Sequence, residues 1–456
     1  MTSTRKTNGT KNASAASELP PPAYFLSLTV ENVRCFSERQ TLDLSDGNDR
    51  PRQWTILLGE NGVGKTTLLQ SLARLQSYET SAFATGKIAF IPLVFLNPYS
   101  TSIQERNLKP RGESVLFHLE SKICINSKLS SLVRSKIIDN WCLDATHLSG
   151  NSQGTYENLG GLICYGYGAG RRMGTTDLSE SQSMDTIISL FDDNATLINA
   201  EEWLLQADYA AKSLEGANQK RAADRLIRIK KALCDLLPDV SDIDFKPTKT
   251  VPIRIMAQAK TPYGWVSIKD LSLGYRTMMT WMVDFASRLL ERYPDSPNPL
   301  AEPAIALIDE IDLHLHPKWQ RTLVQDLSKT FPNTQFIVSA HSPLVVQSAT
   351  DANIVLLQRV DDHVEIKNKM EMRKGLRVDQ LLTSDLFGLE SARPPQIEDA
   401  LRERSHILSK SRLTAKDKSR LRELGVQIGA LPTGELPQDI EAMDVLRRAA
   451  EFIKQG

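Results

Sequence analysis

The stretch WTILLGENGVGKTTLLQSLARL, residues 54–75, decides the fold of this 456-residue chain. It begins with an apolar run typical of a buried strand, continues through a glycine-rich turn and ends with the apolar spacing of a helix. Residues 59–66, GENGVGKT, match the pattern G-x-x-x-x-G-K-[ST], which holds a phosphate between a strand and the following helix. This order of elements predicts a fold of the α/β class.

The glycine-rich turn has the residue types that hold a nucleoside triphosphate with Mg²⁺. Its glycines let backbone N–H groups surround the β-phosphate, Lys65 neutralises the β and γ oxygens, and the Thr66 hydroxyl binds Mg²⁺ at the positive end of the helix. Chance produces such a match in roughly one or two per cent of chains of this length. The residues expected to contact ATP here are Asn61, Gly62, Gly64, Lys65, Thr66 and Thr67.

A second apolar run, AIALI at 304–308, ends in Asp309 and Glu310. Ligands of α/β sheets bind at the carboxyl ends of strands, so both carboxylates are expected beside the nucleotide. Asp309 suits Mg²⁺, and Glu310 can orient or deprotonate the attacking water next to the γ-phosphate. We therefore predict Thr66 and Asp309 as the metal site and Glu310 as a catalytic residue.

Residues 271–275, LSLGY, lie between these two motifs at the start of an expected helix. A serine at a helix start is an ordinary N-cap, so the segment alone is a weak signal. The Ser272 hydroxyl and the Gly274 amide nevertheless form an anion site at the positive end of that helix. Both residues are therefore predicted to bind nucleotide.

Three of the histidines that follow the acidic pair are candidates for a functional role. His341 comes after the apolar strand expected at 336–338 and can donate a hydrogen bond to a γ-phosphate, although a lone histidine at a strand end is more often structural. His314 and His316 have the i, i+2 spacing of a metal pair, but the sequence offers no evident third ligand. His341 is kept as a second catalytic residue, and a histidine metal site is disfavoured.

The rest of the chain divides by composition and periodicity. The elements expected outside the motifs are an antiparallel strand pair at 24–30 and 41–44, strands at 251–257 and 264–268, and a helix over 272–291. The expected parts are a disordered tail over 1–23, a nucleotide-binding head over 24–100 and 250–370, an inserted mostly helical lobe over 101–249 and a helical C-terminal extension over 371–456. In the extension, Thr414 is expected to cap a helix that ends at Gly425.

Composition narrows the classes of partner and compartment. Lys+Arg and Asp+Glu both number 55, so any nucleic-acid surface has to be a local patch. One basic stripe, Arg221, Arg225 and Arg228, is interpreted first as a solvated helix face. The five cysteines lie far apart without a C-x-x-C pair, and no apolar run is long enough to cross a membrane. A cytoplasmic protein without a membrane span is expected.

The motifs, taken in order, resemble those of the ABC-class ATPases over roughly residues 24–100 and 250–358. The resemblance implies an ATPase head with a mixed sheet that dimerises head to tail. Ser272 and Gly274 of one subunit would then contact the ATP held by Lys65 of the other, and Asp312 would act across that interface. Leu273 and Tyr275 replace the usual Gly and Gln of the signature. The Q-loop glutamine has no clear position, and the segment ICYGYGAGRRM at 163–173 is the candidate for that region.

Within this class, the opening LSLTVENVRCFSERQTLDLS is similar to that of SMC, RecF and OLD-like ATPases, which act on DNA. The insert is too short for an SMC arm, and no D-x-D follows His341, as a Toprim nuclease domain would need. The stretches SLFDDNATLINAEEWLLQADYA, LCDLLPDV and VDQLLTSDLFGL resemble bacterial anti-phage ATPases, namely PtuA of Septu and ATPases that accompany retrons.

The resemblance implies an ATPase of an anti-phage system that binds ATP and Mg²⁺, oligomerises and controls a separate nuclease effector of HNH type. DNA, or the RNA and DNA of a retron, are the candidate nucleic-acid partners. Two alternatives stay open. One is a RecF-like DNA repair ATPase, and the other is a scaffold in which ATP acts as a slowly hydrolysed clamp.

Overall fold

The computed structural model describes residues 21–81, 88–92, 118–125, 136–144, 161–174, 186–247, 253–370, 375–389, 391–392, 394–410 and 414–429. The chain divides into two compact units, residues 1–381 and 382–456. Residues 1–20 of the expected tail lie outside the described part, and the first strand already begins at Ala23. No helix in the described ranges has the length and apolar character needed to cross a bilayer.

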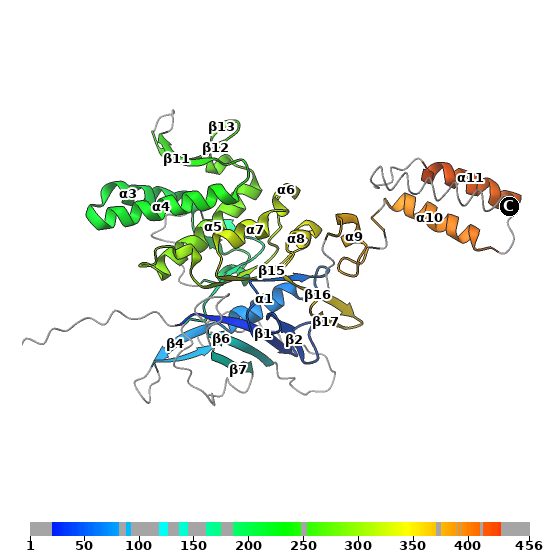
Figure 1. The fold of residues 1–456 in the computed structure, drawn as a ribbon, viewed down its shortest axis with the longest axis horizontal. Helices are drawn as coiled ribbons and strands as arrows, with labels where there is room; N and C mark the ends of the chain where they lie inside the picture. The colour runs from blue at the N-terminus through cyan, green and yellow to red at the C-terminus, as the bar shows by residue number, and fades with distance from the viewer. Residues whose placement is uncertain are drawn as a thin grey trace, which may run out of the picture. The chain divides into compact units, whose positions relative to one another are not determined.

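A six-stranded sheet forms the centre of the first unit (Figure 1). Its strand order is β17 (His363–Lys367), β16 (Asn353–Val360), β3 (Trp54–Leu58), β15 (Thr334–Ser339), β14 (Ala304–Ile308) and β8 (Cys164–Tyr167). All neighbouring pairs are parallel except β16 and β17. Every residue of β3, β14 and β15 is buried, as expected for strands covered on both faces. Because these strands are parallel, their carboxyl ends meet at one edge of the sheet.

A second, antiparallel sheet has the order β2 (Gln40–Asp43), β1 (Ala23–Glu31), β6 (His118–Ile125) and β7 (Lys136–Asp144). It confirms the strand pair expected at 24–30 and 41–44. Helix α1 (Lys65–Arg74) lies between the two sheets, and its Leu68, Leu69 and Leu72 belong to the core that also contains residues of β1 and β3 (Figure 1). The helix that follows the glycine-rich turn is thus held from both sides.

The expectation of a mostly helical lobe over 101–249 is wrong for β6, β7 and β8, which belong to the two sheets. The described part of β6 has the two-residue period of a strand, with Leu119, Ser121 and Ile123 buried and the residues between them partly exposed. Among the described residues of this region, the α-helices are α3 (Ala200–Ser213) and α4 (Gly216–Leu236). The described residues of this range therefore combine strands of both sheets with a pair of helices.

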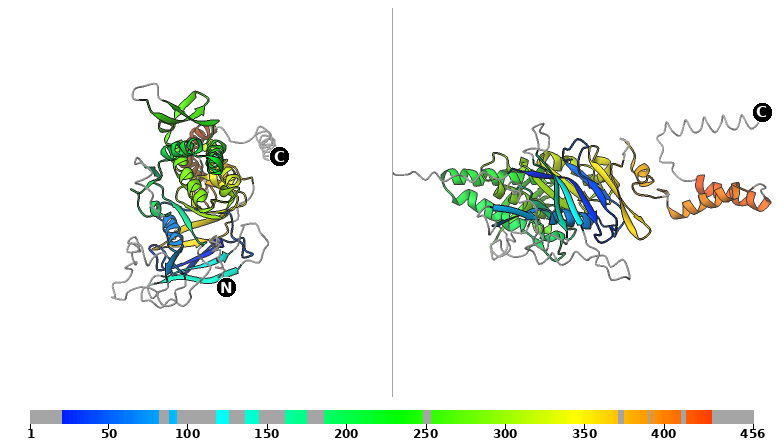
Figure 2. Two further views of the ribbon diagram at one scale, coloured as in Figure 1. Left: turned by 90° about the vertical axis from the view of Figure 1, so that its left-hand side faces the viewer. Right: turned by 90° about the horizontal axis from the view of Figure 1, so that it is seen from below.

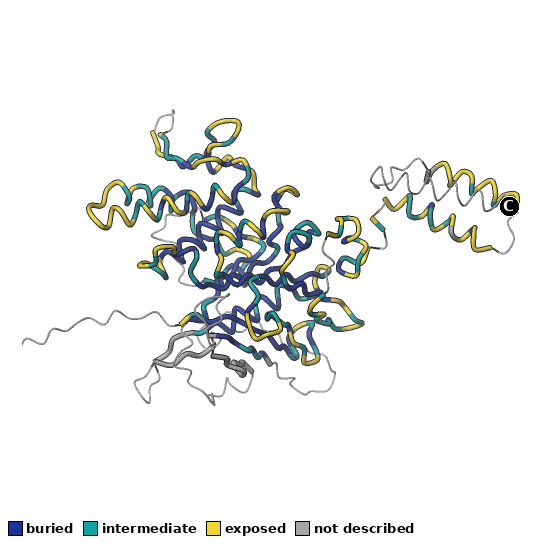
Figure 3. Tube along the Cα trace, in the orientation of Figure 1, coloured by how far each residue is buried: buried dark blue, intermediate teal, exposed yellow. Residues whose placement is uncertain are grey.

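Helices cover the other face of the central sheet (Figures 1 and 2). The expected helix at 272–291 is α5 (Leu273–Arg292), which packs against α3 and α4. On α4, Leu226, Ile229 and Leu233 are buried, whereas Arg221 and Arg228 are exposed, which agrees with a solvated basic face. Figure 3 shows that burial is concentrated in the central sheet and falls off along α3 and α4.

The remaining elements of the first unit are short. Strands β11 (Asp242–Pro247), β12 (Ile255–Thr261) and β13 (Gly264–Ser267) form an antiparallel sheet, which agrees in part with the strands expected at 251–257 and 264–268. The other described elements are β4 (Ser77–Ser81), β5 (Ile88–Pro92), β9 (Arg172–Met173), β10 (Thr196–Leu197), α6 (Pro317–Gln320), α7 (Leu323–Thr330), α8 (Pro343–Ser348) and α9 (Val378–Leu382).

The second unit contains a hairpin of α10 (Pro395–Leu408) and α11 (Ala415–Gly429). Ala400, Ile407 and Leu424 form its small buried core. Thr414 caps α11 as expected, because its hydroxyl accepts a hydrogen bond from the Asp417 amide at 3.2 Å. The expected end at Gly425 is wrong, since the helix continues to Gly429. Nothing lies within 4 Å of a methyl group placed on Gly425, so this glycine fits an exposed helical position.

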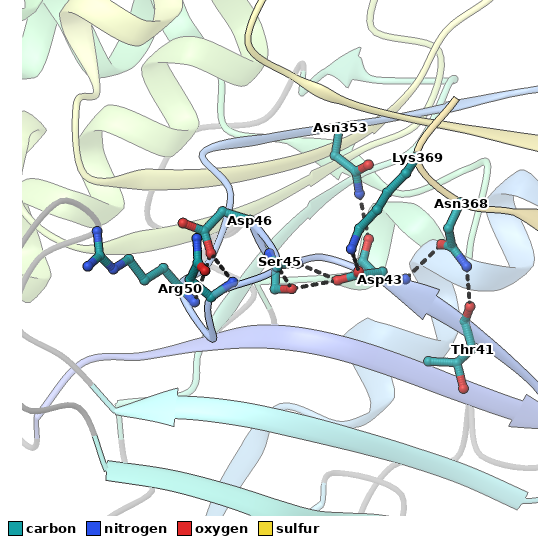
Figure 4. A network of polar contacts seen from close by, with 10 residues as sticks. Thr41, Asp43, Ser45, Asp46, Arg50, Asn353, Asn368 and Lys369 are labelled. Atoms are coloured by element: carbon teal, nitrogen blue, oxygen red, sulfur yellow. Dashed lines mark hydrogen bonds and ion pairs between the residues drawn. The ribbon is translucent and has the colours of Figure 1, made fainter. Parts of the chain in front are cut away.

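A polar network around Asp43 ties the antiparallel sheet to the central one (Figure 4). The Asp43 carboxylate accepts hydrogen bonds from Ser45 and pairs with Lys369 at 2.8 Å. Its backbone N–H donates to Asn368, and its carbonyl accepts from Asn353. Burial alone would raise the pKa of Asp43, but the hydrogen bonds from Lys369 and Ser45 outweigh it and hold the pKa below its usual value.

We expect Asp43→Asn to lower the free energy of unfolding by about 1–2 kcal/mol at neutral pH, because a charged acceptor loses its cation and hydroxyl partners. The folded-state pKa lies below the unfolded value, so this stabilisation is complete above about pH 4 and is lost as the pH falls further. Urea unfolding of both proteins at pH 7 and at about pH 3 measures the difference. Asp49→Asn, which removes an exposed pair with Lys122, is the control, and an equal loss in both variants would contradict the prediction.

Candidate nucleotide-binding site

The loop between β3 and α1 has the backbone that its glycines permit. Gly59, Gly62 and Gly64 have φ angles of 141°, 80° and 90°, a region that favours glycine. A Cβ on Gly64 would lie 2.5 Å from the Cys35 Sγ, and one on Gly59 would lie 2.5 Å from the Leu357 carbonyl oxygen. The pattern recognised in the sequence is therefore required by both conformation and space.

Lys65 begins α1 and is only 7% exposed. Its ammonium group donates hydrogen bonds of 2.8 Å to the carbonyl oxygens of Gly59 and Glu60, so the side chain curls back over the loop. Burial lowers the pKa of Lys65, and the nearby carboxylates of Asp309 and Glu310 oppose that shift. The loop thus holds a desolvated positive charge against its own backbone.

Asp309 lies at the carboxyl end of β14, directly opposite the start of α1. One of its oxygens accepts a hydrogen bond from the Thr66 hydroxyl at 2.6 Å, and the other accepts from the Ser339 hydroxyl at the end of β15. The Ser339 hydroxyl in turn accepts the Glu310 N–H at 2.7 Å. Thr66 and Asp309, predicted together as the metal site, are therefore in direct contact, and Ser339 links them to Glu310.

The Glu310 backbone has a φ angle of 48°, which is unusual for a residue with a side chain. Its N–H is held by Ser339, and its carbonyl accepts a hydrogen bond of 2.6 Å from Arg171 Nη2. Arg171 is only 3% exposed, and burial lowers its pKa to about 10, against the opposing charges of Asp309 and Asp312. Sequence reasoning missed both Ser339 and Arg171, because no local pattern marks either residue.

A cavity of about 340 Å³ collects most of the predicted residues at this edge of the sheet. Arg34 and Cys35, from the turn after β1, were not predicted, and Arg34 Nη1 donates to the Thr67 hydroxyl at 3.4 Å. The lining residues are Arg34, Cys35, Asn61, Gly62, Gly64, Lys65, Thr66, Thr67, Asp309, Glu310 and His341.

Asp312 lies beside this cavity and does not line it. It is 9% exposed, and its carboxylate accepts a hydrogen bond of 2.9 Å from the His341 backbone N–H. His341 itself is exposed and lines the cavity. Within one chain, Asp312 therefore positions the histidine, and its expected action across a subunit interface stays a prediction.

The predicted signature residues lie at the start of α5, and neither of them lines the cavity. Ser272 is the exposed N-cap, and its hydroxyl makes no capping hydrogen bond. A Cβ on Gly274 would lie 2.4 Å from the His314 carbonyl oxygen, so packing alone requires glycine there. Tyr275, one departure from the usual signature, packs against Trp319 with the two rings tilted by 44°, and its hydroxyl donates a hydrogen bond to the Pro238 carbonyl at 2.7 Å.

The segment 163–173 contributes β8, which pairs with β14, and the loop that leads into β9. This loop carries Arg171 to the Glu310 carbonyl, so the segment does reach the acidic pair, but it contains no glutamine. The His316 ring accepts the Lys318 N–H and caps α6. In the ranges that the structure describes, no group of three or more His, Cys, Asp or Glu residues is arranged to hold a metal.

Two family models match this chain. Residues 27–94, which contain the glycine-rich loop, match a family described as an AAA domain. Residues 169–347, which contain Arg171, α5 and the acidic pair, match a family described as "AAA domain, putative AbiEii toxin, Type IV TA system". The two matches lie on either side of β6, β7 and β8.

Curated relatives include two proteins with names that match the resemblance. The retron Vc95 probable ATPase of Vibrio cholerae serotype O1 biovar El Tor is 43% identical over 145 residues, which cover 32% of this chain and 28% of that protein. The Septu protein PtuA of Bacillus mycoides strain KBAB4 is 28% identical over 361 residues, 77% of this chain and 43% of that protein. The chain thus spans less than half the length of either relative.

Among solved structures, the SMC head domain from Thermotoga maritima matches with a TM-score of 0.37 and 14% identity, over 76% of this chain and 99% of that one. The α/β class is confirmed by the central sheet itself, with its parallel strands and the loop between β3 and α1. The AAA-domain matches and the similarity to Septu PtuA and a retron ATPase confirm the resemblance to anti-phage ATPases that the motifs predicted.

Proposed function

We propose that this chain binds and hydrolyses ATP with Mg²⁺ and acts in an anti-phage defence system. The observation that carries this proposal is the hydrogen-bonded row from Thr66 through Asp309 and Ser339 to Glu310, next to the buried Lys65. These groups share one cavity with the glycine-rich loop. The similarity to proteins named ATPases supports the same reaction class.

The oxygen donors at the cavity suit Mg²⁺. Thr66 Oγ1 and the buried Asp309 carboxylate are hard ligands only 2.6 Å apart, and the second Asp309 oxygen is fixed by Ser339. When bound, Mg²⁺ neutralises charge on the phosphate oxygens. Lys65, which lies over the loop and donates to its carbonyls, would neutralise the β and γ oxygens of the bound nucleotide.

Glu310 orients the attacking water, and His341 donates a hydrogen bond to the γ-phosphate. Support for the first role comes from the backbone of Glu310, which is clamped through its N–H by Ser339 and through its carbonyl by Arg171. Such support from neighbouring groups limits how far a catalytic side chain strays from its reactive position. Support for the second role is the exposure of His341 in the cavity, with its backbone held by Asp312.

The chain acts as a head-to-tail dimer or higher oligomer in which Ser272 and Gly274 complete the ATP site of a second subunit. Ser272 is exposed with a free hydroxyl at the positive end of a long helix, and Leu273 beside it is 49% exposed. Neither signature residue lines the cavity of its own chain. Asp312, which holds His341, is the residue that would transmit contact between subunits.

Destruction of the target belongs to a separate effector, a nuclease of HNH type, which this chain controls. The sequence after His341 contains no D-x-D, and no HNH-type histidine cluster occurs. The α10–α11 hairpin carries exposed apolar side chains, Val426 at 76% and Leu408 at 50%, that suit docking of a second protein.

The test measures phosphate release and nucleic-acid cleavage by the purified 456-residue chain. With Mg²⁺ and ATP it should release phosphate but leave plasmid DNA and tRNA intact, and cleavage should appear only when the protein encoded beside it is added. Phosphate release no faster than that of a Lys65→Ala control would contradict the ATPase. Cleavage by the lone chain, abolished by a point substitution in it, would contradict the division of labour.

A further inference from the structure

A second cavity, of about 970 Å³, lies between the start of α5 and the segment 169–174 that follows β8. Its walls come from Arg171 and from Arg172 at the start of β9, from the first two turns of α5 with Arg276, and from Lys269 just before that helix. The turn after β14 closes it with Leu313. None of its lining residues lines the cavity around the glycine-rich loop.

The charged side chains on these walls are mostly positive, and some of their N–H groups have no hydrogen-bond partner. Nε and Nη1 of Arg171, and Nε of Arg276, are buried without any hydrogen-bond partner. Arg172 is exposed, and Lys269 already pairs with Glu201 at 2.8 Å. Asp193 is the acidic residue in the lining.

Buried guanidinium atoms without partners are costly, because a lost hydrogen bond to water is not replaced. Arg171 is only 3% exposed, and its one hydrogen bond runs from Nη2 to the Glu310 carbonyl. Guanidinium groups bind phosphate oxygens in a bidentate manner, which would satisfy such free N–H groups. The cavity therefore has the chemistry of a phosphate site.

We propose that this cavity binds a small phosphate-bearing ligand of nucleotide size, separately from the ATP held by the glycine-rich loop. Its volume is in the range of small-ligand pockets, and Leu273, Met173 and Leu313 provide apolar walls beside the three arginines. The arginines and the apolar walls together fit a nucleotide better than inorganic phosphate. Neither Ser272 nor Gly274 lines this cavity, so the site differs from the one that the signature residues complete in a second subunit.

Arg171 connects this cavity to the acidic pair. The same side chain that lines the cavity holds the Glu310 carbonyl through Nη2, while its Nε and Nη1 atoms are buried without a hydrogen-bond partner. A phosphate that draws the guanidinium toward the cavity also pulls on the strained backbone of Glu310.

The test uses the whole 456-residue chain with Lys65→Ala. Every copy then carries the substitution, so no glycine-rich loop in the sample presents a normal ATP site. Equilibrium dialysis with labelled ATP and with labelled pyrophosphate measures the binding that remains. We expect ATP to bind more tightly than pyrophosphate, and Arg172→Ala or Arg276→Ala, added to Lys65→Ala, to weaken both by about tenfold or more, as loss of a charge-assisted contact does.

Arg228→Ala is the matched control, because it removes an exposed arginine from α4, which contributes no residue to the cavity. Arg172 is also exposed, so its variant tests the site even where a change at Arg276 disturbs folding. The proposal would be overturned if Lys65→Ala bound neither ligand. It would also be overturned if the Arg172 and Arg276 variants bound as well as the Arg228→Ala control. If the wild-type chain does not hydrolyse ATP but Lys65→Ala still binds ATP at the second cavity, the proposed ATPase would be overturned and the second site would remain.

Discussion

Glu310→Gln should lower the rate of phosphate release at least ~100-fold while ATP affinity stays close to that of the wild type. The glutamine keeps the shape of the side chain and leaves the backbone contacts with Ser339 and Arg171 in place. It removes only the charge that orients or deprotonates the water. Equilibrium binding of ATP and single-turnover phosphate release, measured on both proteins, separate the two effects.

The matched control is Glu365→Gln on β17, which makes the same change on a strand of the same sheet that contributes nothing to the cavity. Its turnover should equal that of the wild type. Glu310→Gln with turnover near the wild-type rate would show that another group activates the water, whereas a large loss of ATP affinity would assign Glu310 to binding.

Mixing two inactive variants should restore activity if ATP is held between subunits. Ser272→Arg places a bulky cation at the exposed start of α5 and should block assembly without preventing nucleotide binding at Lys65. Lys65→Ala should weaken nucleotide binding itself. A mixed head-to-tail dimer rebuilds one composite site of two, so an equal mixture should recover about a quarter of wild-type activity.

Ser213→Arg, which adds the same charge at the exposed end of α3, is the control for surface charge and should behave as the wild type. Activity is measured as phosphate release, and assembly by size-exclusion chromatography with ATP. Full activity of Ser272→Arg alone would eliminate the arrangement between subunits. Two inactive variants that stay inactive when mixed would also contradict it.

The elements that were predicted correctly are each specified by residues close together in the sequence. The glycine-rich loop, the buried strand before Asp309 and the long helix after Ser272 are each specified by neighbouring residues, and the structure places all three as expected. The same holds for the Thr414 cap, where donor and acceptor are three residues apart. Local hydrogen bonds and local periodicity can be read without knowledge of the fold.

The parts that were missed depend on partners far along the chain. Strands β6 and β8 are stabilised by pairing with β1 and β14, and nothing within residues 118–125 or 164–167 names those partners. Arg171 gains its role from a carbonyl 139 residues away. Ser339 likewise becomes part of the site only because β15 lies next to β14.

The position of β3 in the central sheet has a consequence for how the chain is made. Its Trp54 side chain donates a hydrogen bond to Ser328, 274 residues later, and both neighbours of β3, strands β15 and β16, come later still. At the usual rate of synthesis, this gap corresponds to roughly 15–55 s on the ribosome. Throughout that time an apolar strand, WTILL, has left the ribosome without the strands that cover its edges. We therefore expect chaperones to cover this strand on the nascent chain until β15 and β16 have been made and the nucleotide site can form.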